Sequence, residues 1–228
     1  WGGRVLDGDP QELRVGGHAY AIGTAPGRIV SKGVAEDADD PSVRIYRVRR
    51  DYRTADLRLD AAEMLNVGLS EVADADVVAL RAQYEKDWKE WPVAKGAPYY
   101  DRDGNGQYNP KFNAQGNPDL SGDEPGVAGA DQVAWFVLND LDPGASAALY
   151  GSNPIGLEIQ VTLWGYARTD ALGDVVFKKY SVIYKGKTDT PDTASIKDMY
   201  FAQWSDPDLG DFGDDFAGCD VDLSLGYV

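Results

Sequence analysis

The strongest constraint on the fold is a run of alternating side chains in the second half of the chain. Large apolar side chains stand there at every second position: Leu157, Ile159, Val161 and Leu163. A period of two predicts a β-strand with one buried face. Similar runs, rich in β-branched and aromatic residues, begin near residues 132, 175 and 198. Together they predict a mainly β fold, an antiparallel β-sandwich-like domain.

The first 54 residues also favour β-structure. The stretch GGRVLDGDPQELRVGG indicates a hairpin, with Asp7-Gly8 at the turn between two short extended runs. HAYAIG, RIVSKGV and VRIYRVRR follow as further strands, separated by breaks rich in Gly, Pro and Asp. We therefore expect β-hairpins over residues 1–54.

A helical insertion is predicted from about residue 55 to residue 91, where glycines are few and helix-forming residues dominate. Its apolar side chains recur at spacings of three and four: Val77, Leu80, Tyr84, Trp88 and Trp91. That spacing places them on one helix face, which we expect to pack in the core. Pro92 ends the helical segment.

The remaining chain divides into an acidic, glycine-rich loop over residues 93–130 and antiparallel strands over residues 131–228. No internal repeat or low-complexity linker separates these parts, so we expect residues 1–228 to form one domain. The sequence begins and ends in strand-like runs, and we expect it to be a fragment of a longer polypeptide.

The chain has one cysteine and one histidine among 228 residues. A single Cys excludes an internal disulfide and a cysteine-rich zinc site, and a single His excludes a three-histidine zinc centre. His18 lies in a predicted strand, and Cys219 is expected to be a small buried residue. The usual hydrolytic mechanisms are therefore disfavoured, and we expect a protein that is not an enzyme.

Acidic residues number 38 against 22 basic ones, a net charge of −16. Residues 1–100 carry 17 acids and 14 bases, whereas residues 101–228 carry 21 acids and 8 bases. This charge would repel nucleic acid, and no apolar run approaches the ~20 residues that a membrane-spanning helix needs. Concentrated carboxylates favour a bound cation, although a solvated acidic surface is the simpler alternative.

The clearest metal-binding pattern is DRDGNGQY, which begins at Asp101. It matches the D-x-[DN]-x-[DN]-G opening of a calcium loop, in which oxygens two residues apart converge on one hard cation. The bidentate Glu of an EF-hand is replaced by Phe112, so a further carboxylate must come from Asp119, Asp123 or Glu124. The alternative is an ion-free turn. The predicted Ca²⁺ ligands are Asp101, Asp103, Asn105, Gln107 (by its carbonyl), Asp123 and Glu124.

A second acidic stretch, WSDPDLGDFGDDFAGCD, has short carboxylates between glycines, which suits an oxygen cage for Ca²⁺. The alternatives are a folded acidic turn and, less favoured, catalysis. The ligands predicted in this stretch are Asp206, Asp208, Asp211, Asp214, Asp215 and Asp220.

Several segments resemble a recurring region of large exported proteins of Bacteroidetes and Rhodothermus-like bacteria, many of which carry a type IX secretion sorting domain. These segments are WPVAKGAPYYDRDGNGQY, ADQVAWFVLNDLD, GLEIQVTLWGYARTDALGDVVFKKYSVIYKG and WSDPDLGDFGDDFAGCDVDLSLGYV. The resemblance implies an extracellular or cell-surface location. It implies no reaction.

Three functions remain open from the sequence. The first is a calcium-stabilised structural or adhesive segment of a secreted or cell-surface protein, whose partners are other domains of the polypeptide or neighbouring surface subunits. The second is a module that binds or cleaves polysaccharide, which requires an exposed row of Trp or Tyr beside a carboxylate pair. The third is a subunit of an extracellular filament or surface layer, joined through unpaired edge strands.

Overall fold

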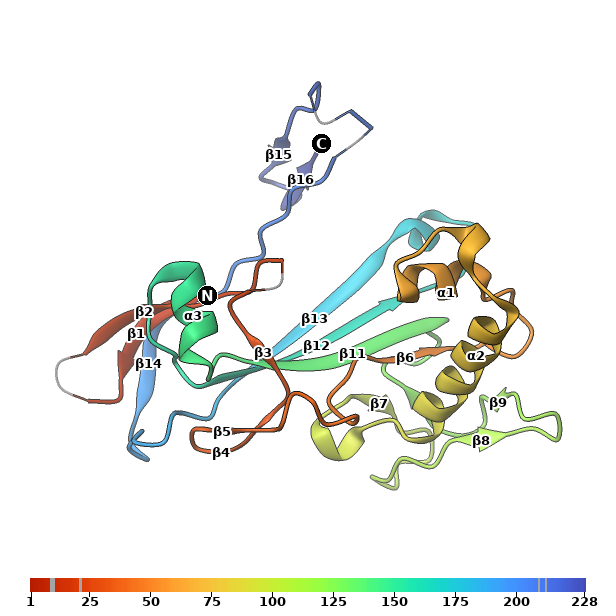
Figure 1. Ribbon diagram of the computed structural model, residues 1–228, viewed down its shortest axis with the longest axis horizontal. Helices are drawn as coiled ribbons and strands as arrows, with labels where there is room; N and C mark the ends of the chain where they lie inside the picture. The colour runs from red at the N-terminus through yellow and green to blue at the C-terminus, as the bar shows by residue number, and fades with distance from the viewer. Residues whose placement is uncertain (9–10, 21, 209, 212) are drawn as a thin grey trace.

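The computed structural model describes residues 1–8, 11–20, 22–208, 210–211 and 213–228, and these residues form a mainly β structure with antiparallel sheets (Figure 1). Its centre is a sheet of three long strands in the order β13-β12-β11. Val161 of β12 lies opposite Phe136 on one neighbour and Tyr180 on the other. The strands are β11 (Gln132–Asn139), β12 (Leu157–Gly165) and β13 (Val176–Tyr184). The predicted long strands are thus confirmed.

Two short strands share the outer edge of β11. One is β6 (Tyr46–Arg49), which pairs with residues 132–135, and the other is β3 (Ala25–Pro26), which pairs with residues 138–139. Between these two pairings the chain leaves the sheet edge, so residues 27–45 form a separate excursion. That excursion contains the hairpin of β4 (Ile29–Ser31) and β5 (Val34–Ala35).

The predicted N-terminal hairpin is confirmed as β1 (Gly2–Leu6) and β2 (Glu12–Val15); Asp9 and Pro10 of its turn lie outside the described residues. On its other edge β1 pairs with β14 (Ser195–Tyr200). Val5 and Ile196 of this three-stranded sheet pack against the β12–β13 end of the central sheet. The first and last thirds of the chain therefore share one apolar cluster.

The helical segment is also confirmed. It consists of α1 (Arg58–Leu65), a 3-10 turn over Leu69–Glu71 and α2 (Asp74–Lys89). The predicted apolar face of α2 is buried: Trp88 and Trp91 pack with Trp135 against β6 and β11, and Leu80 and Tyr84 pack against α1. The apolar face of α2 therefore covers one face of the central sheet near β6, and its packing in the core was predicted.

On either side of β11, residues 93–150 form short elements. The acidic loop holds two small antiparallel pairs, β7 (Tyr99–Tyr100) with β10 (Glu124–Pro125) and β8 (Lys111–Phe112) with β9 (Pro118–Asp119). Beyond β11, Asp142 accepts hydrogen bonds from the backbone N–H groups of Gly144 and Ala145 and so begins α3 (Pro143–Tyr150).

Phe201 still packs against Trp1 and Tyr180, and beyond Trp204 the chain leaves the body. Residues 201–208 have no regular structure, and a hairpin of β15 (Gly218–Asp220) and β16 (Leu225–Tyr227) stands away from the sheets (Figure 1). Among the described residues, no helix is long and apolar enough to cross a membrane.

Three expectations, one about the burial of strand β12 and two about single residues, are wrong. Strand β12 is buried on both faces over most of its length, because Glu158 and Thr162 on its polar face are 0% and 4% exposed. His18 lies outside the named strands and is exposed, with Nδ1 2.8 Å from Thr24 Oγ1. Cys219 is exposed in β15. The sandwich arrangement and the calcium loops stay predictions.

Candidate metal centre

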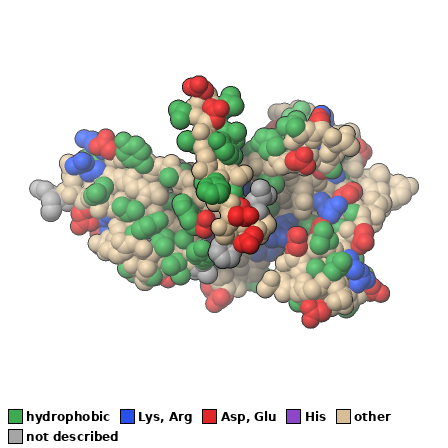
Figure 2. All heavy atoms as spheres, turned by 90° about the horizontal axis from the view of Figure 1, so that it is seen from above, with side chains coloured by type: hydrophobic (Ala, Val, Ile, Leu, Met, Phe, Trp, Pro, Cys, Tyr) green, Lys and Arg blue, Asp and Glu red, His purple; other side chains and the backbone are tan. Residues whose placement is uncertain are grey.

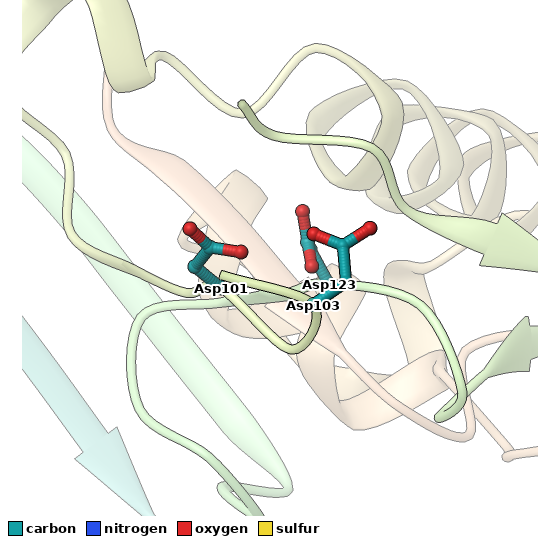
Figure 3. Close-up of side chains that lie close together, drawn as sticks. All are labelled: Asp101, Asp103 and Asp123. Atoms are coloured by element: carbon teal, nitrogen blue, oxygen red, sulfur yellow. The ribbon is translucent and has the colours of Figure 1, made fainter. Parts of the chain in front are cut away.

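The acidic loop is closed by the pairing of β7 with β10. Glu124 lies opposite Tyr100 in this antiparallel pair. Asp123, which precedes Glu124, and Asp101, which follows Tyr100, therefore lie at the same end of the short ladder. Figure 3 shows Asp101, Asp103 and Asp123 gathered around the turn that follows β7. The strand pairing therefore brings Asp123 to a loop that lies about twenty residues earlier in the sequence.

One carboxylate oxygen from each of Asp101, Asp103 and Asp123 lies within 4.8 Å of the other two. Asp123 is buried, Asp101 is half-buried and Asp103 is exposed. Carboxylates this close repel one another, and a cation between them removes the repulsion. The arrangement is open to solvent on the Asp103 side, which gives an ion a route of entry.

The Asp101 carboxylate organises the turn. Its Oδ1 accepts hydrogen bonds from the backbone N–H groups of Gly104 (2.8 Å) and Asn105 (3.2 Å), and its Oδ2 accepts one from Gly106 (2.7 Å). Gly104 and Gly106 have φ angles of +71° and +74°, a conformation that favours glycine. The hydrogen bond from Gly106 is the main reason that the pKa of Asp101 lies below its usual value, so this group is a carboxylate at neutral pH.

Asp123 fixes the two ends of the same loop. Its Oδ1 accepts a hydrogen bond from the backbone N–H of Arg102, and its Oδ2 accepts one from the backbone N–H of Asn109, both at 2.9 Å. The loop is anchored to the core by Tyr108, whose hydroxyl donates to the Trp88 carbonyl oxygen of α2 at 2.5 Å. The carboxylate positions thus depend on a rigid, partly buried frame.

Glu124, a predicted ligand, faces away from the cluster toward two guanidinium groups. Arg50 and Arg102 each donate a hydrogen bond to its carboxylate, and the backbone N–H of Gly129 donates a third at 3.2 Å. Glu124 is 3% exposed. Burial raises the pKa of Glu124. The hydrogen bonds from Arg50, Gly129 and Arg102 lower the pKa by more than burial raises it, so the net shift is downward.

This lowered pKa predicts an acid-dependent loss of stability. A carboxyl group whose pKa is lower in the folded state stabilises the fold above its unfolded pKa of about 4.3, and this contribution disappears as the pH falls through the folded value. Glu124→Gln is expected to cost about 1.5–3 kcal/mol at pH 7, since hydrogen bonds to a charged group are lost. Urea unfolding in chelator from neutral to acidic pH is expected to show a shallower acid dependence in this variant. An unchanged acid dependence would contradict the assignment.

The remaining predicted ligands of this loop lie nearby but outside the three-carboxylate cluster. Asn105 donates to Asp103 from its backbone N–H and its side-chain amide, and its Oδ1 accepts from the backbone N–H of Gln107. Asp119, named as a possible further carboxylate, accepts instead from the backbone N–H of Ser121 in an exposed turn. Of the three candidate carboxylates, the structure brings Asp123 to the loop.

The second acidic stretch is arranged differently. Within the described residues, its aspartates do not form a group of three with ligand atoms this close together, and Leu209 and Phe212 of the stretch lie outside the described residues. Its predicted ligands are exposed or half-buried along residues that extend away from the body (Figure 1): Asp206, Asp208, Asp211, Asp214, Asp215 and Asp220. An ion site in this stretch stays a prediction.

The chemistry of the Asp101–Asp103–Asp123 cluster suits a hard cation. All three groups offer oxygen, and neither nitrogen nor sulfur ligands stand among them. Calcium accepts six to eight oxygen ligands in irregular geometry, including backbone carbonyls and water, whereas transition metals favour imidazole or thiolate. Three carboxylates suit a hard cation such as calcium. The Gln107 carbonyl as a further ligand stays a prediction.

A second feature, which no pattern in the sequence indicates, is a groove of about 1090 Å³ over the other face of the central sheet. Phe136, Leu138 and Val161 lie in its lining, and exposed aromatic side chains such as Tyr20 and Trp204 stand around it. The groove joins residues from many separate segments of the chain, and alternation alone does not show which face of a strand stays uncovered.

Comparison with known proteins adds no assignment: no protein-family model, no curated protein and no solved structure matches this chain.

Proposed function

We propose that this chain is a calcium-stabilised structural or adhesive segment of a secreted or cell-surface protein, without enzymatic activity. The observation that supports the proposal most is the cluster of Asp101, Asp103 and Asp123, in which strand pairing adds a third carboxylate to a calcium-loop pattern. Its partners would be other domains of the same polypeptide or neighbouring surface subunits. The resemblance to exported surface proteins supports the location.

The physical mechanism is linkage between ion binding and folding. The three carboxylates come together only when β7 pairs with β10, so an ion that binds them favours the folded state. Extracellular calcium sites with dissociation constants of ~10⁻⁴–10⁻³ M are occupied at millimolar calcium. Calcium would then rigidify residues 101–124 against α2 and the central sheet. The sandwich-like arrangement forms part of this proposal, supported by the packing of Val5 and Ile196 against the central sheet.

Cleavage of polysaccharide is less well supported. A glycosidase needs two carboxyl groups, one of which donates a proton and has a raised pKa. The lining of the groove includes one carboxylate, Glu36, within the described residues. Burial raises the pKa of Glu36, but hydrogen bonds from Arg28 and Lys95 outweigh it, so the net shift is downward. This environment suits an ion pair better than a general acid.

The test is thermal unfolding in chelator and in millimolar calcium. For a site with a dissociation constant of ~10⁻⁴–10⁻³ M, calcium is expected to add about 0.4–1.4 kcal/mol, or about 1–5 °C in Tm for a chain of this length. Asp103→Ala, which removes the side-chain oxygens, is expected to remove most of this increase. Asp103 is exposed and its side chain accepts hydrogen bonds from Asn105 alone among the described residues, so the fold itself should persist.

The matched control is Asp119→Ala, which makes the same change in the same acidic loop but outside the cluster. It is expected to keep the full calcium response. Equal responses from the wild type, Asp103→Ala and Asp119→Ala would contradict the site, and so would a Tm that calcium does not change.

A further inference from the structure

The groove over the central sheet is edged by exposed aromatic rings. Tyr20 is 90% exposed, Trp204 is 72% exposed and Tyr150 is 55% exposed, and all three line the groove. They come from a turn near the N-terminus, from the segment after β14 and from α3. Figure 2 shows hydrophobic side chains gathered on the half of the molecule that carries β1, β14 and α3. Single exposed rings are ordinary, but rings from separate segments that meet at one groove indicate a binding site.

Inside the groove, further rings form a connected row. Phe201 stacks on Trp1, with ring centroids 6.2 Å apart and an interplanar angle of 9°, and its ring centroid lies 5.2 Å from that of Tyr180 on β13. The Tyr180 hydroxyl donates a hydrogen bond to Gln203 Oε1 at 3.3 Å. This contact ties the segment that carries Phe201 and Trp204 to the central sheet, so the fold itself holds the row in place.

The groove also carries polar atoms that have no protein partner. The hydroxyl groups of Tyr20 and Tyr150 and the indole N–H of Trp204 make no hydrogen bond among the described residues. Lys178, exposed on the groove face of β13, makes no ion pair among them either. An acyl chain would leave these groups without partners. Aromatic faces bordered by free donors and acceptors suit a ligand that is apolar on its faces and polar at its edges.

The charges of the groove favour a neutral ligand. Two of its bases are already paired, Arg44 with Asp87 at 2.5 Å and Lys95 with Glu36 at 3.2 Å. Lys178 is the one base of the described lining that is left unpaired. The net charge of −16 repels polyanions from the molecule as a whole. A ligand with hydroxyl groups in place of charges meets no such repulsion.

We propose that the groove binds a neutral β-1,4-linked glucan, whose pyranose rings stack on Trp204, Tyr20 and Tyr150. In β-linked glucose the hydroxyl groups lie around the edge of the ring, so each face presents C–H groups to an aromatic side chain. The volume of about 1090 Å³ exceeds the about 300–1,000 Å³ of pockets for small molecules, so a chain of several sugar rings has room. The proposal concerns binding without cleavage, because Glu36 is the one carboxylate in the described lining. It does not depend on calcium binding at Asp103.

The test is calorimetric titration of the 228-residue chain with cellohexaose at fixed calcium. Saturable binding at millimolar ligand or below is expected. Trp204→Ala and Tyr20→Asn are each expected to raise the dissociation constant by about tenfold or more, because each removes a stacking ring. Trp204 lies in a segment without regular structure, and Tyr20 has a φ of +54°, a conformation that asparagine adopts more readily than tyrosine. Both variants are therefore expected to fold.

The matched control is Tyr200→Ala. Tyr200 is 77% exposed and close to Trp204 in the sequence, but it does not line the groove. This variant is expected to bind cellohexaose as the wild type does, and equal weakening by Tyr200→Ala and Trp204→Ala would overturn the proposal. Asp103→Ala is also expected to keep wild-type binding of cellohexaose, so the glucan site and the calcium site can fail separately.

Two further ligands test the chemistry of the groove. Hexagalacturonate has as many sugar rings as cellohexaose but a negative charge on each, and it is expected to bind at least about tenfold more weakly. Dodecanoate offers an apolar chain without hydroxyl groups. Binding of dodecanoate but not of cellohexaose would overturn the proposal, because it assigns the groove to an acyl chain. Absence of cellohexaose binding at millimolar ligand, or equal affinity for hexagalacturonate, would overturn it as well.

Discussion

Replacing Glu158 with alanine is expected to lower the free energy of unfolding by about 3–5 kcal/mol, as breaking a buried ion pair does. Glu158 is 0% exposed at the centre of the fold. Its Oε2 accepts from Lys185 Nζ at 2.5 Å and from the backbone N–H of Ile29 at 2.8 Å, and its Oε1 accepts from Gln160 Nε2 at 2.9 Å. The side chain thus joins β12, β4 and the residue that follows β13. Alanine removes the carboxylate from all three donors, although Lys185 Nζ still donates to the Ile29 carbonyl oxygen at 2.9 Å.

Equilibrium unfolding in urea measures this loss. Glu158→Gln keeps the shape and an acceptor oxygen, and the Lys185 side chain is 31% exposed and can regain water, so a smaller loss is expected. Glu63→Ala is the control, since Glu63 is exposed on α1, and a change within about 0.5 kcal/mol is expected. A loss below about 1 kcal/mol in Glu158→Ala would contradict the role assigned to this pair.

Replacing Asp140 with alanine is expected to destabilise the protein by at least about 3 kcal/mol, because three buried backbone N–H groups lose their acceptor. Asp140 is 1% exposed at the end of β11. Its Oδ1 accepts from Gly156 at 2.9 Å and Leu157 at 2.6 Å, and its Oδ2 accepts from Ile155 at 2.9 Å. This carboxylate therefore ends β11 and begins β12 at the same point.

The same urea experiment measures the effect of Asp140, with Asp142→Ala as the neighbouring comparison. Asp142 caps α3, so its loss is expected to cost about 0.5–2 kcal/mol, which is less than the loss at Asp140. Equal losses at the two positions would show that Asp140 does not hold the buried turn.

The parts of the fold that local periodicity determines could be predicted. The alternation through Leu157 and Ile159 located β12, and the helical spacing of Tyr84 and Trp88 located the buried face of α2. Both periodic patterns repeat within one element, so each element can be recognised without knowing which other elements pack against it. The helix α3 was not predicted, because its main signal is the single cap at Asp142.

Burial by distant segments could not be predicted. The sequence places Glu158 on the polar face of its strand, but Ile29 and Lys185 cover it and provide its partners. The same limit applies to the candidate metal ligands. Asp101 and Asp103 could be predicted from their spacing, whereas Asp123 was one of three possible carboxylates. The pairing of β7 with β10 is what brings Asp123 to the other two. Contacts across a sheet depend on register, which one-dimensional spacing does not contain.

Calorimetric titration of the chelator-treated protein with calcium measures binding at the Asp101–Asp103–Asp123 cluster. We expect binding with a dissociation constant of ~10⁻³ M or tighter, weakened at least about tenfold by Asp103→Ala and unchanged by Asp119→Ala. Absence of binding, or binding that Asp103→Ala leaves unchanged, would contradict a calcium site at Asp101, Asp103 and Asp123.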